Sequence, residues 1–587
     1  MVVHHLGKLL LVGLLLMIGV LIVKEATTDY PAQLPVTTAG YVDMCLSCHA
    51  DEELDPAHDA RVLGCSPCHL GDAMARDKDK AHEGMVLNPG DLRVVHRTCG
   101  VEGCHPADVE KVKNSLMATN RGILATLLYY WGETDTQDAD ISVEQLLESG
   151  DTSLALDYYR KLCATCHLWQ VKNSLPGLPA FFNAKGGGCS ACHHVQPGGP
   201  SLATVDNVEV AEEASGDLAA KKPHPLITAK VPEENCIRCH NRSGRTGLSY
   251  IGIFESEGYG TPYEGGGLSH KRLPGNRFYL EIAEDVHHTK KMVCIDCHTR
   301  EEIMGDGNRY AHYEEQMEIS CESCHSEQPG ITRKGRQLNN IDQEGERFVL
   351  RGKVNAVELE VKPPNPESCN FAGHERLSCE SCHSTWVPQC YGCHVKRDAG
   401  EIDLDKLALK ETPGWWEEGR SYIRYEKPML AVWGEEVVIV TPGCQDVVTL
   451  VDEQGEIAGG FNRFTMAAIN PHTTQAKGRS CKECHADPKT IGLGEGVVYK
   501  KDGRWHFDPV DRGVDTLEGR TVGLDNFVDI DGNPLQLGSR ENLRPFTGEE
   551  LRRILRIGLC LDCHHDSDDP AYRNYTPERT CPVFVEP

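Results

Sequence analysis

The pattern of apolar and polar positions begins with one uninterrupted apolar run near the N-terminus. Residues 9–23 read LLLVGLLLMIGVLIV and follow Lys8. Counted from residue 6, the run reaches about 18 residues, which borders on the length of a membrane-spanning helix. The stretch KEATTDYPAQ behind it offers no small-x-small cleavage signal. We therefore expect residues 1–28 to form an uncleaved membrane anchor, with a cleaved export signal as the alternative.

Helical periodicity follows in two later stretches. Residues 106–131 (PADVEKVKNSLMATNRGILATLLYYW) start with Pro, and their apolar positions recur three and four residues apart. This pattern predicts one or two helices. We expect a further helix over residues 142–162. Residues 199–230 and 244–275 contain many Gly, Pro and charged residues and are interpreted as loops.

Strand patterns dominate the C-terminal third of the chain. Residues 428–460 are rich in β-branched side chains and are interrupted by turn residues. Residues 497–507 (VVYKKDGRWHF) have the pattern of a hairpin around Asp502-Gly503. We expect a β-rich insert over residues 401–540.

Composition and charge narrow the class of protein. The 587 residues are 40% hydrophobic and only 6% aromatic, so the polypeptide brings few large side chains to a core for its length. The formal net charge is -28. Such a charge keeps the chain soluble, argues against nucleic acid as a partner and would steer basic proteins towards it.

The candidate chemistry lies in one five-residue motif, Cys-x-x-Cys-His. With 27 Cys and 27 His in the chain, chance placement would give well under one copy, yet the motif occurs eleven times. A twelfth, stretched copy reads CGVEGCH. Numbered 1 to 12 in chain order, the motifs begin at Cys45, Cys65, Cys99 (the stretched copy), Cys163, Cys189, Cys236, Cys294, Cys321, Cys379, Cys390, Cys481 and Cys560.

Each motif has the groups that attach a c-type haem. Its two thiols can form thioether bonds to the haem vinyl groups, and its histidine can become the proximal iron ligand. Zinc sites or a disulfide framework would not require a histidine after every second cysteine. The second cysteines are Cys48, Cys68, Cys104, Cys166, Cys192, Cys239, Cys297, Cys324, Cys382, Cys393, Cys484 and Cys563. The predicted proximal ligands are His49, His69, His105, His167, His193, His240, His298, His325, His383, His394, His485 and His564.

The remaining histidines nearly match the predicted haems in number. Two precede the apolar run, and thirteen others lie outside the motifs. This tally favours two histidine ligands on most irons, although any one of these residues could instead be an ordinary hydrogen-bonded histidine. The distal candidates are His58, His82, His96, His194, His224, His270, His287, His288, His312, His374, His472, His506 and His565. For the adjacent His287 and His288, we expect only one to face an iron.

The motifs of residues 45–565 resemble those of multihaem c-type cytochromes from anaerobic metal-, sulfur- and nitrogen-respiring bacteria. The resemblance implies a multihaem cytochrome c fold with little regular secondary structure and scattered helices around stacked haems. It implies about twelve haem c groups per chain. In such proteins a CHH sequence lets the second histidine serve a neighbouring haem, which applies to His194 and His565.

Met117 is a further distal candidate that the resemblance suggests. Related cytochromes often place a Ser-x-His ligand on the helix after a haem motif, and Met117 takes that place after His105. A thioether ligand would raise the potential of that haem. The alternative is that Met117 packs in its helix like most methionines.

The motifs divide the chain into four expected regions. They are residues 1–28 (anchor or signal), 29–245 (motifs 1–6), 246–400 (motifs 7–10) and 401–587 (the β-rich insert with motifs 11 and 12). Three cysteines remain outside the motifs, namely Cys369, Cys444 and Cys581, and allow at most one disulfide.

Two functions are weighed from these features. The first is an electron carrier without catalytic residues, tethered in the periplasm and exchanging electrons with other cytochromes or a quinol-oxidising membrane complex. Secretion after signal cleavage is the alternative location. The second function is a multihaem reductase or oxidase of a small nitrogen or sulfur compound, which needs one open iron. The stretched motif is its only candidate site, because no motif has Lys in place of His. A filament subunit is a third, structural possibility.

Overall fold

The chain forms two compact units in the computed structural model. The residues that it describes are 2–27, 34–50, 54–171, 187–195, 224–242, 244–256, 272–273, 277–365, 373–419, 422–510, 513–515, 521–561, 563–564 and 569–573. Unit 1 comprises Met1–Pro89 and Lys221–Ile227, and unit 2 comprises Gly90–Ala220 and Thr228–Pro587. The division into four regions by motifs stays a prediction.

Unit 1 is built from short helical turns. Its elements are α1 (Val2–Thr27), η1 (Met44–Ser47), η2 (Pro56–His58), α2 (Ala60–Leu63), α3 (Ser66–His69), α4 (Lys78–Ala81) and β2 (Leu226–Ile227). Four of the short turns begin at an aspartate whose carboxylate accepts a backbone N–H of the first turn. These N-caps explain why this polar stretch forms turns rather than longer helices.

Helix α1 contains the apolar N-terminal run. The large apolar side chains between Leu11 and Val23 are 42% to 66% exposed. Among the described residues, no helix is both long enough and apolar enough to cross a membrane. The anchor function of residues 1–28 stays a prediction.

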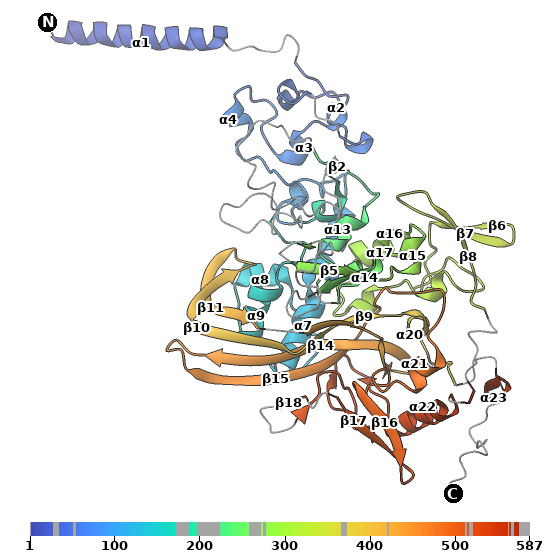
Figure 1. The fold of residues 1–587 in the computed structure, drawn as a ribbon. Helices are drawn as coiled ribbons and strands as arrows, with labels where there is room; N and C mark the ends of the chain where they lie inside the picture. The colour runs from blue at the N-terminus through green and yellow to red at the C-terminus, as the bar shows by residue number, and fades with distance from the viewer. Residues whose placement is uncertain are drawn as a thin grey trace. The chain divides into compact units, whose positions relative to one another are not determined.

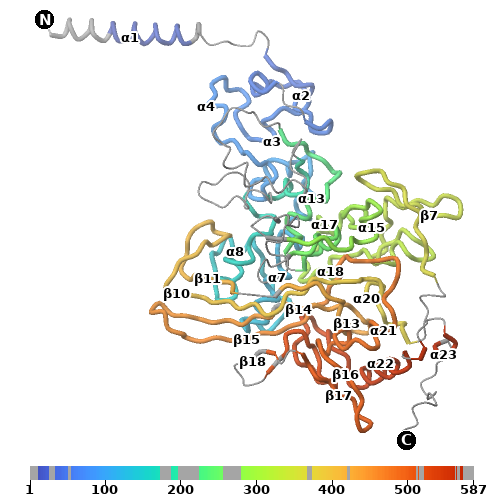
Figure 2. The backbone as a smooth tube through the Cα atoms, viewed as in Figure 1, coloured from blue at the N-terminus to red at the C-terminus, as the bar shows by residue number. Residues whose placement is uncertain are grey.

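Unit 2 contains most of the helices, and nearly all of them are short. They are η3 (Val95–Arg97), α5 (Pro106–Asn114), α6 (Leu116–Thr119), α7 (Arg121–Tyr130), α8 (Val143–Ser149), α9 (Leu154–Tyr158), the π-helix η4 (Tyr159–Cys163), α11 (Ser190–His193), α13 (Glu233–Ile237), α14 (Thr246–Tyr250), α15 (Val286–Thr289), α16 (Cys294–Cys297), α17 (Arg300–Met304), α18 (Tyr313–Gln316), η6 (Cys321–Ser323), α20 (Cys379–His383), α21 (Cys481–His485), α22 (Gly548–Cys560) and α23 (Pro570–Arg573). Figure 2 follows the backbone between them.

The predicted helices exist but are divided. Residues 106–131 form three helices, because Ser115 is extended and Asn120 has a left-handed φ of 49°. The single helix expected over residues 142–162 is wrong, since α8 ends at Gly150 with a φ of 67°. Gly is favoured at such a C-terminal position because it has no Cβ.

The loop expectations are tested only in part. Residues 246–256, expected to be loop, instead form α14 and strand β3. Most of the other predicted loop, residues 201–223, lies outside the described residues. The hairpin around Asp502-Gly503 is confirmed, since strands β16 and β17 pair antiparallel and both turn residues have positive φ.

The strands of unit 2 gather towards the C-terminal third. They are β1 (His194–Val195), β3 (Ile253–Ser256), β4 (Arg272–Leu273), β5 (Arg277–Glu281), β6 (Ile341–Glu344), β7 (Arg347–Arg351), β8 (Glu358–Val361), β9 (Val387–Tyr391), β10 (Cys393–Asp405), β11 (Lys410–Glu418), β12 (Tyr422–Glu426), β13 (Met429–Trp433), β14 (Glu436–Val451), β15 (Ile457–Ala468), β16 (Gly496–Lys501), β17 (Arg504–Pro509), β18 (Val514–Asp515), β19 (Thr521–Val522), β20 (Leu537–Gly538) and β21 (Leu543–Arg544).

A mixed sheet of seven strands is the largest β element (Figure 1). Its order is β11-β10-β14-β13-β21, with β15 beside β14 and β20 beside β15. Strand β10 runs parallel to β14 and β15 parallel to β20, whereas β11 pairs antiparallel with β10, and β13 and β15 pair antiparallel with β14. Helices account for about 30% of the chain and strands for about 25%. This is ordinary for a globular protein and more regular structure than we expected.

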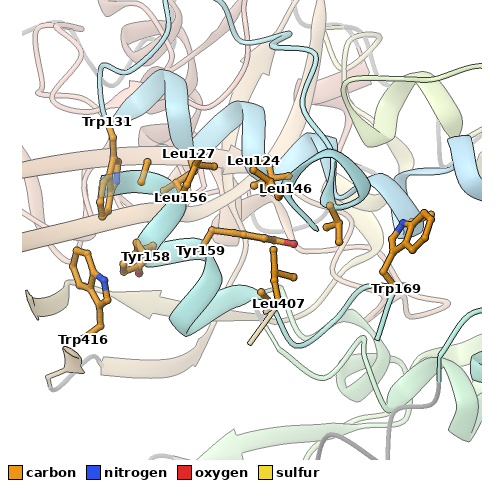
Figure 3. Close-up of a cluster of buried hydrophobic side chains, with 14 of the residues drawn as sticks. Leu124, Leu127, Trp131, Leu146, Leu156, Tyr158, Tyr159, Trp169, Leu407 and Trp416 are labelled. Carbon is orange, nitrogen blue, oxygen red and sulfur yellow. The ribbon is translucent and has the colours of Figure 1, made fainter. Parts of the chain in front are cut away.

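The main core lies where helices α7 to α9 pack on this sheet. Figure 3 shows Leu124, Leu127 and Leu156 together with the rings of Trp131 and Trp416. The ring centroids of Trp131 and Trp416 are 5.9 Å apart. These aromatic side chains come from a helical segment and a strand far apart in sequence. The core therefore joins helices α7 to α9 to the seven-stranded sheet.

Candidate functional site

Most motifs fold as one tight turn. In seven of them, the histidine N–H donates to the carbonyl of the first cysteine over 2.7–3.0 Å. The stretched motif closes in the same way, because His105 N–H donates to the Cys99 carbonyl at 2.9 Å. Motifs 9 and 11 are the one-turn helices α20 and α21. One short segment therefore presents two thiols and an imidazole.

Motifs 4 and 10 have different backbone settings. Cys163 is the last residue of the π-helix η4. Cys390 and Cys393 lie in strands β9 and β10, so motif 10 belongs to the sheet region rather than to a helical turn.

The cysteines of the motifs are thiols rather than disulfides. In the described part of the chain, none of the 24 motif cysteines is in a disulfide. Burial raises the pKa of Cys163 and of Cys192 to about 12, and that of Cys324 to about 11. Reactive redox cysteines have a lowered pKa. These three thiols are therefore protonated at neutral pH and are not activated as thiolates.

Five motif histidines lie next to a histidine from outside the motifs. The ring centroids are 6.4 Å apart for His49–His82, 6.0 Å for His69–His224, 6.1 Å for His325–His287, 6.2 Å for His298–His472 and 5.8 Å for His485–His374. Two imidazoles on opposite sides of one ion, each bonded over about 2.0 Å, hold their centroids roughly 6 Å apart. Each pair therefore has the spacing of two axial ligands.

Three imidazoles of these pairs, those of His69, His472 and His485, are suited to bind a metal at neutral pH. Burial lowers the pKa of His69 and His485. Burial and the nearby His298 lower the pKa of His472 to about 4. A histidine must be neutral to bind a metal, and these groups are neutral at pH 7.

Hydrogen bonds at Nδ1 fix the tautomer of many motif histidines. Seven of the twelve have a carbonyl or carboxylate partner, which leaves Nε2 for a metal. The carbonyl partners are Val86 for His69 (2.7 Å), Thr228 for His193 (2.8 Å), Lys362 for His325 (2.8 Å), Gln475 for His383 (2.9 Å) and Ile554 for His485 (3.0 Å). The carboxylate partners are Glu302 for His298 (3.1 Å) and Asp569 for His564 (2.9 Å).

The structure distinguishes the adjacent His287 and His288. His287 donates its Nδ1–H to Asp285, whose Oδ1 lies 2.8 Å away, and its ring lies beside that of His325. Both nitrogens of His288 face carboxylates, at 2.9 Å from Glu284 and 3.4 Å from Glu233. These contacts raise the pKa of His288. His287 has the setting of a ligand, and His288 that of an ion-paired residue.

Other distal candidates are not in the five pairs. His312 directs Nε2 at Asp138 over 3.1 Å, and His506 stacks on Tyr499 with centroids 5.4 Å apart. His58 has Asp55 at 3.1 Å from Nδ1. His96 lies in η3 and His194 starts β1. Two further candidates, His270 and His565, lie outside the described residues, as do Cys369 and Cys581.

Met117 lies in α6, next to motif 4. Its backbone carbonyl accepts the N–H of Leu168 at 3.1 Å, and Leu168 follows His167 in the chain. The role of Met117 as an iron ligand stays a prediction, and so does the alternative that it packs in its helix.

Neighbouring motifs of unit 2 form a connected series. The thiol of Cys189 hydrogen-bonds to that of Cys99, Cys236 to Cys294, and Cys379 to Cys321. These contacts couple motifs 3 and 5, 6 and 7, and 8 and 9. The Asn235 side chain donates to the Cys192 carbonyl at 2.7 Å, which joins motif 5 to motif 6.

The series continues through the later motifs. Cys297 lies within electrostatic range of Cys324, and Cys484 within range of Cys382, so motif 7 adjoins motif 8 and motif 9 adjoins motif 11. Motif 11, which stands by itself in the sequence, is thus not isolated in space. The Cys166 thiol contacts the Cys239 carbonyl at 3.9 Å, which attaches motif 4 to motif 6 as a side branch.

Sequence reasoning missed the acidic residues that hold the motifs. In unit 1, the buried Asp43 accepts the N–H groups of Cys45 (3.0 Å) and Cys65 (2.7 Å), the first residues of motifs 1 and 2. Asp285 and Glu302 hold His287 and His298. The available signals were local, since Asp43 and Asp285 lie two residues before their partners and Glu302 lies four after His298.

The described residues contain no group of three or more His, Cys, Asp or Glu side chains arranged as a metal site. The candidate sites are therefore pairs of imidazoles beside pairs of thiols. Comparison with family models, with curated proteins and with solved structures finds no match to this chain.

Proposed function

We propose that this chain is a multihaem c-type cytochrome that transfers electrons through about twelve haem c groups between redox partners in anaerobic respiration. The observation that carries the proposal is the set of five imidazole pairs, each joining a motif histidine to another histidine at 5.8–6.4 Å. A chance arrangement of histidines would not repeat this spacing beside five separate cysteine pairs.

The residues present fit the group. The paired thiols of each motif would bind haem covalently, and the motif histidine would be its proximal ligand. His82, His224, His287, His374 and His472 would be distal ligands. When bound, haem c supplies one-electron redox chemistry at its iron. The carbonyls and carboxylates at Nδ1 keep seven of the motif imidazoles in the tautomer whose Nε2 lone pair is available.

The contacts between motifs support a conduit. Motifs 3, 5, 6, 7, 8, 9 and 11 follow one another in unit 2, linked by hydrogen bonds or by electrostatic interactions between their thiols. Each motif would place its group next to that of the next motif. An electron carrier needs such a continuous series, whereas a set of structural haems does not.

The enzyme reading is kept as a second candidate because of the stretched motif. The imidazole of His105 is 56% exposed, and the carboxylate of Asp108 lies 3.7 Å from its Nδ1. An exposed ligand at motif 3 would suit a reductase or oxidase of a small nitrogen or sulfur compound. The proposed electron carrier has no catalytic residues of its own.

The proposed location is the periplasm, tethered through the N-terminal apolar segment, with secretion as the alternative. Covalent haem attachment fits an extracytoplasmic compartment, and the apolar segment fits export. The proposed partners are other cytochromes or a quinol-oxidising membrane complex. The net charge of -28 favours a basic docking surface on the partner and disfavours nucleic acid.

The testing experiment uses the full chain matured with haem. We expect about twelve haems per chain and, after reduction, no change of the Soret band with carbon monoxide, because CO needs a vacant iron position. His287→Ala would open one position, so about one haem in twelve should then bind CO. His288→Ala is the matched control and should bind none.

The outcomes separate the candidates. CO binding by the unchanged chain at about one haem in twelve would favour the enzyme candidate. A haem content far below twelve, or equal CO binding by the His287 and His288 variants, would overturn the proposal.

A further inference from the structure

Buried carboxylates are concentrated around motifs 7 and 8. The described residues contain eight buried Asp and Glu side chains, and four of them lie between residues 285 and 318. These are Asp285, Asp296, Glu302 and Glu318, with exposed fractions of 2%, 1%, 3% and 0%. Buried charges are rare without a specific reason.

Glu302 directs its charge at the proximal histidine of motif 7. Its Oε2 lies 3.1 Å from His298 Nδ1, and it also accepts the N–H of Thr299 at 3.0 Å. The other oxygen accepts the N–H groups of Glu318 and Ile319 at 2.6 and 2.5 Å. Four donors therefore hold the carboxylate in place against the imidazole.

Asp285 has the same arrangement at motif 8, but it contacts the histidine from outside the motif rather than the motif histidine. Its Oδ1 lies 2.8 Å from Nδ1 of His287, the partner of His325, while Oδ2 accepts the N–H of Thr474 at 2.7 Å. Most other Nδ1 partners are backbone carbonyls, as at His69 and His485. The remaining carboxylates that hydrogen-bond to an Nδ1, namely Asp55, Glu284 and Asp569, are 18%, 45% and 27% exposed, so water screens them more.

Cations near motifs 7 and 8 neutralise only part of the negative charge of the four buried carboxylates. Lys353 donates to the Ile295 carbonyl at 2.6 Å beside motif 7, and its backbone N–H donates to Asp296 at 2.6 Å. Arg336 contacts Glu318 at 2.9 Å but is 41% exposed. The summed charge of the four carboxylates, Lys353 and Arg336 is negative.

We propose that Glu302 and Asp285 make motifs 7 and 8 the sites of lowest reduction potential in the series of motifs. A carboxylate at Nδ1 makes the imidazole a stronger donor, and buried negative charge stabilises the ferric over the ferrous state. Reduction would add one electron to one ferric iron. The buried negative charge would make this addition less favourable at motifs 7 and 8 than at the other motifs. Since motifs 7 and 8 lie between motif 6 and motif 9, they divide the series into two pools of more easily reduced sites. This inference rests on the proposed function.

The test begins with assignment of signals in the haem-loaded full chain. His472→Ala and His287→Ala should each remove one low-spin ferric EPR signal, belonging to motif 7 and motif 8. His288→Ala should remove none. If neither ligand variant removes a signal, the ligand pairs and with them the proposed function are wrong.

The second measurement is an EPR-monitored potentiometric titration of the unchanged chain with redox mediators. We expect the two assigned signals to be the last that are reduced. Reduction of either one among the first half of the haems would overturn this inference and leave the proposed function standing. This measurement needs no substitution at Glu302 or Asp285, so it decides even where those variants load haem poorly.

The third measurement removes each charge separately. Glu302→Gln should raise the potential of the motif 7 signal alone, and Asp285→Asn that of the motif 8 signal alone. Glu346→Gln is the matched control, because Glu346 is an exposed acid in the same part of the chain, and it should shift neither. A purely structural role of the two carboxylates would leave both potentials unchanged in variants that keep twelve haems.

Discussion

One acidic residue, Asp43, hydrogen-bonds to two motifs of this chain. Asp43 is fully buried, and its two oxygens accept backbone N–H groups from the start of motif 1 and the start of motif 2. Burial alone would raise the pKa of this carboxyl, but the hydrogen bonds from Cys45 and Cys65 outweigh it and lower the pKa. Asp43 is therefore ionised when the unit is folded, and it joins two segments that are 20 residues apart at their first cysteines.

Asp43→Ala should destabilise unit 1 and reduce its loading with haem. The substitution leaves buried N–H groups without an acceptor, at about 1–3 kcal/mol for each group. We expect intact-mass spectrometry of the matured chain to show about ten haems instead of about twelve. Asp77→Ala removes an exposed helix cap of unit 1 and should keep the full number, so equal losses in both variants would contradict the specific role of Asp43.

At the scale of elements, helix α22 shows how a helix positions a distant motif. Leu551 and Leu555 are buried on one face, and the Ile554 carbonyl accepts from His485 of motif 11. Gly558 allows the close approach, because a Cβ there would lie 2.2 Å from the His485 carbonyl oxygen. The N-terminus of α22 is held by a capping box of Thr547 and Glu550.

Glu550 should make the stability of this region depend on pH. Burial opposes the charge, but Arg544 at 2.7 Å, the Thr547 N–H and Arg376 lower the pKa of Glu550 to about 2. A lowered pKa means that the stabilisation is complete above about pH 4.5, the usual value, and is lost as the pH falls towards 2. Glu550→Gln should remove this pH dependence, measured by thermal unfolding between pH 5 and pH 2.

The control for this measurement is Glu549→Gln, the neighbouring acid in the same first turn. It should leave the acid sensitivity of unfolding in place. An unchanged pH profile in the Glu550 variant would show that other carboxylates govern the acid unfolding of unit 2.

At the scale of the whole molecule, charge should govern encounters with partners. The net charge of -28 attracts basic proteins over distances set by the Debye length, which shortens from about 30 Å at 0.01 M salt to about 10 Å at 0.1 M. Electron exchange with a basic soluble cytochrome should therefore slow by about tenfold or more across this range. Stopped-flow mixing measures the rate, with an acidic cytochrome as the control that should speed up instead. A rate independent of salt would exclude electrostatic docking.

Sequence alone determined the features that depend on local chemistry. Cys-x-x-Cys-His places its reactive groups within five residues, so no tertiary contact is needed to recognise it. The hairpin at Asp502-Gly503 likewise follows from residues that tolerate positive φ. The helices of residues 106–131 were recognisable by their periodicity, but their interruptions at Ser115 and Asn120 were not.

Only the tertiary structure decided which residues meet across long separations. His298 pairs with His472, 174 positions later, and no local pattern specifies that contact. The same holds for the choice of His287 over its neighbour His288, because carboxylates from separate segments occupy both nitrogens of the latter. The count of histidines predicted two histidine ligands for most of the proposed irons. The fold decides the partners, since packing brings together segments whose order along the chain has no bearing on their distance in space.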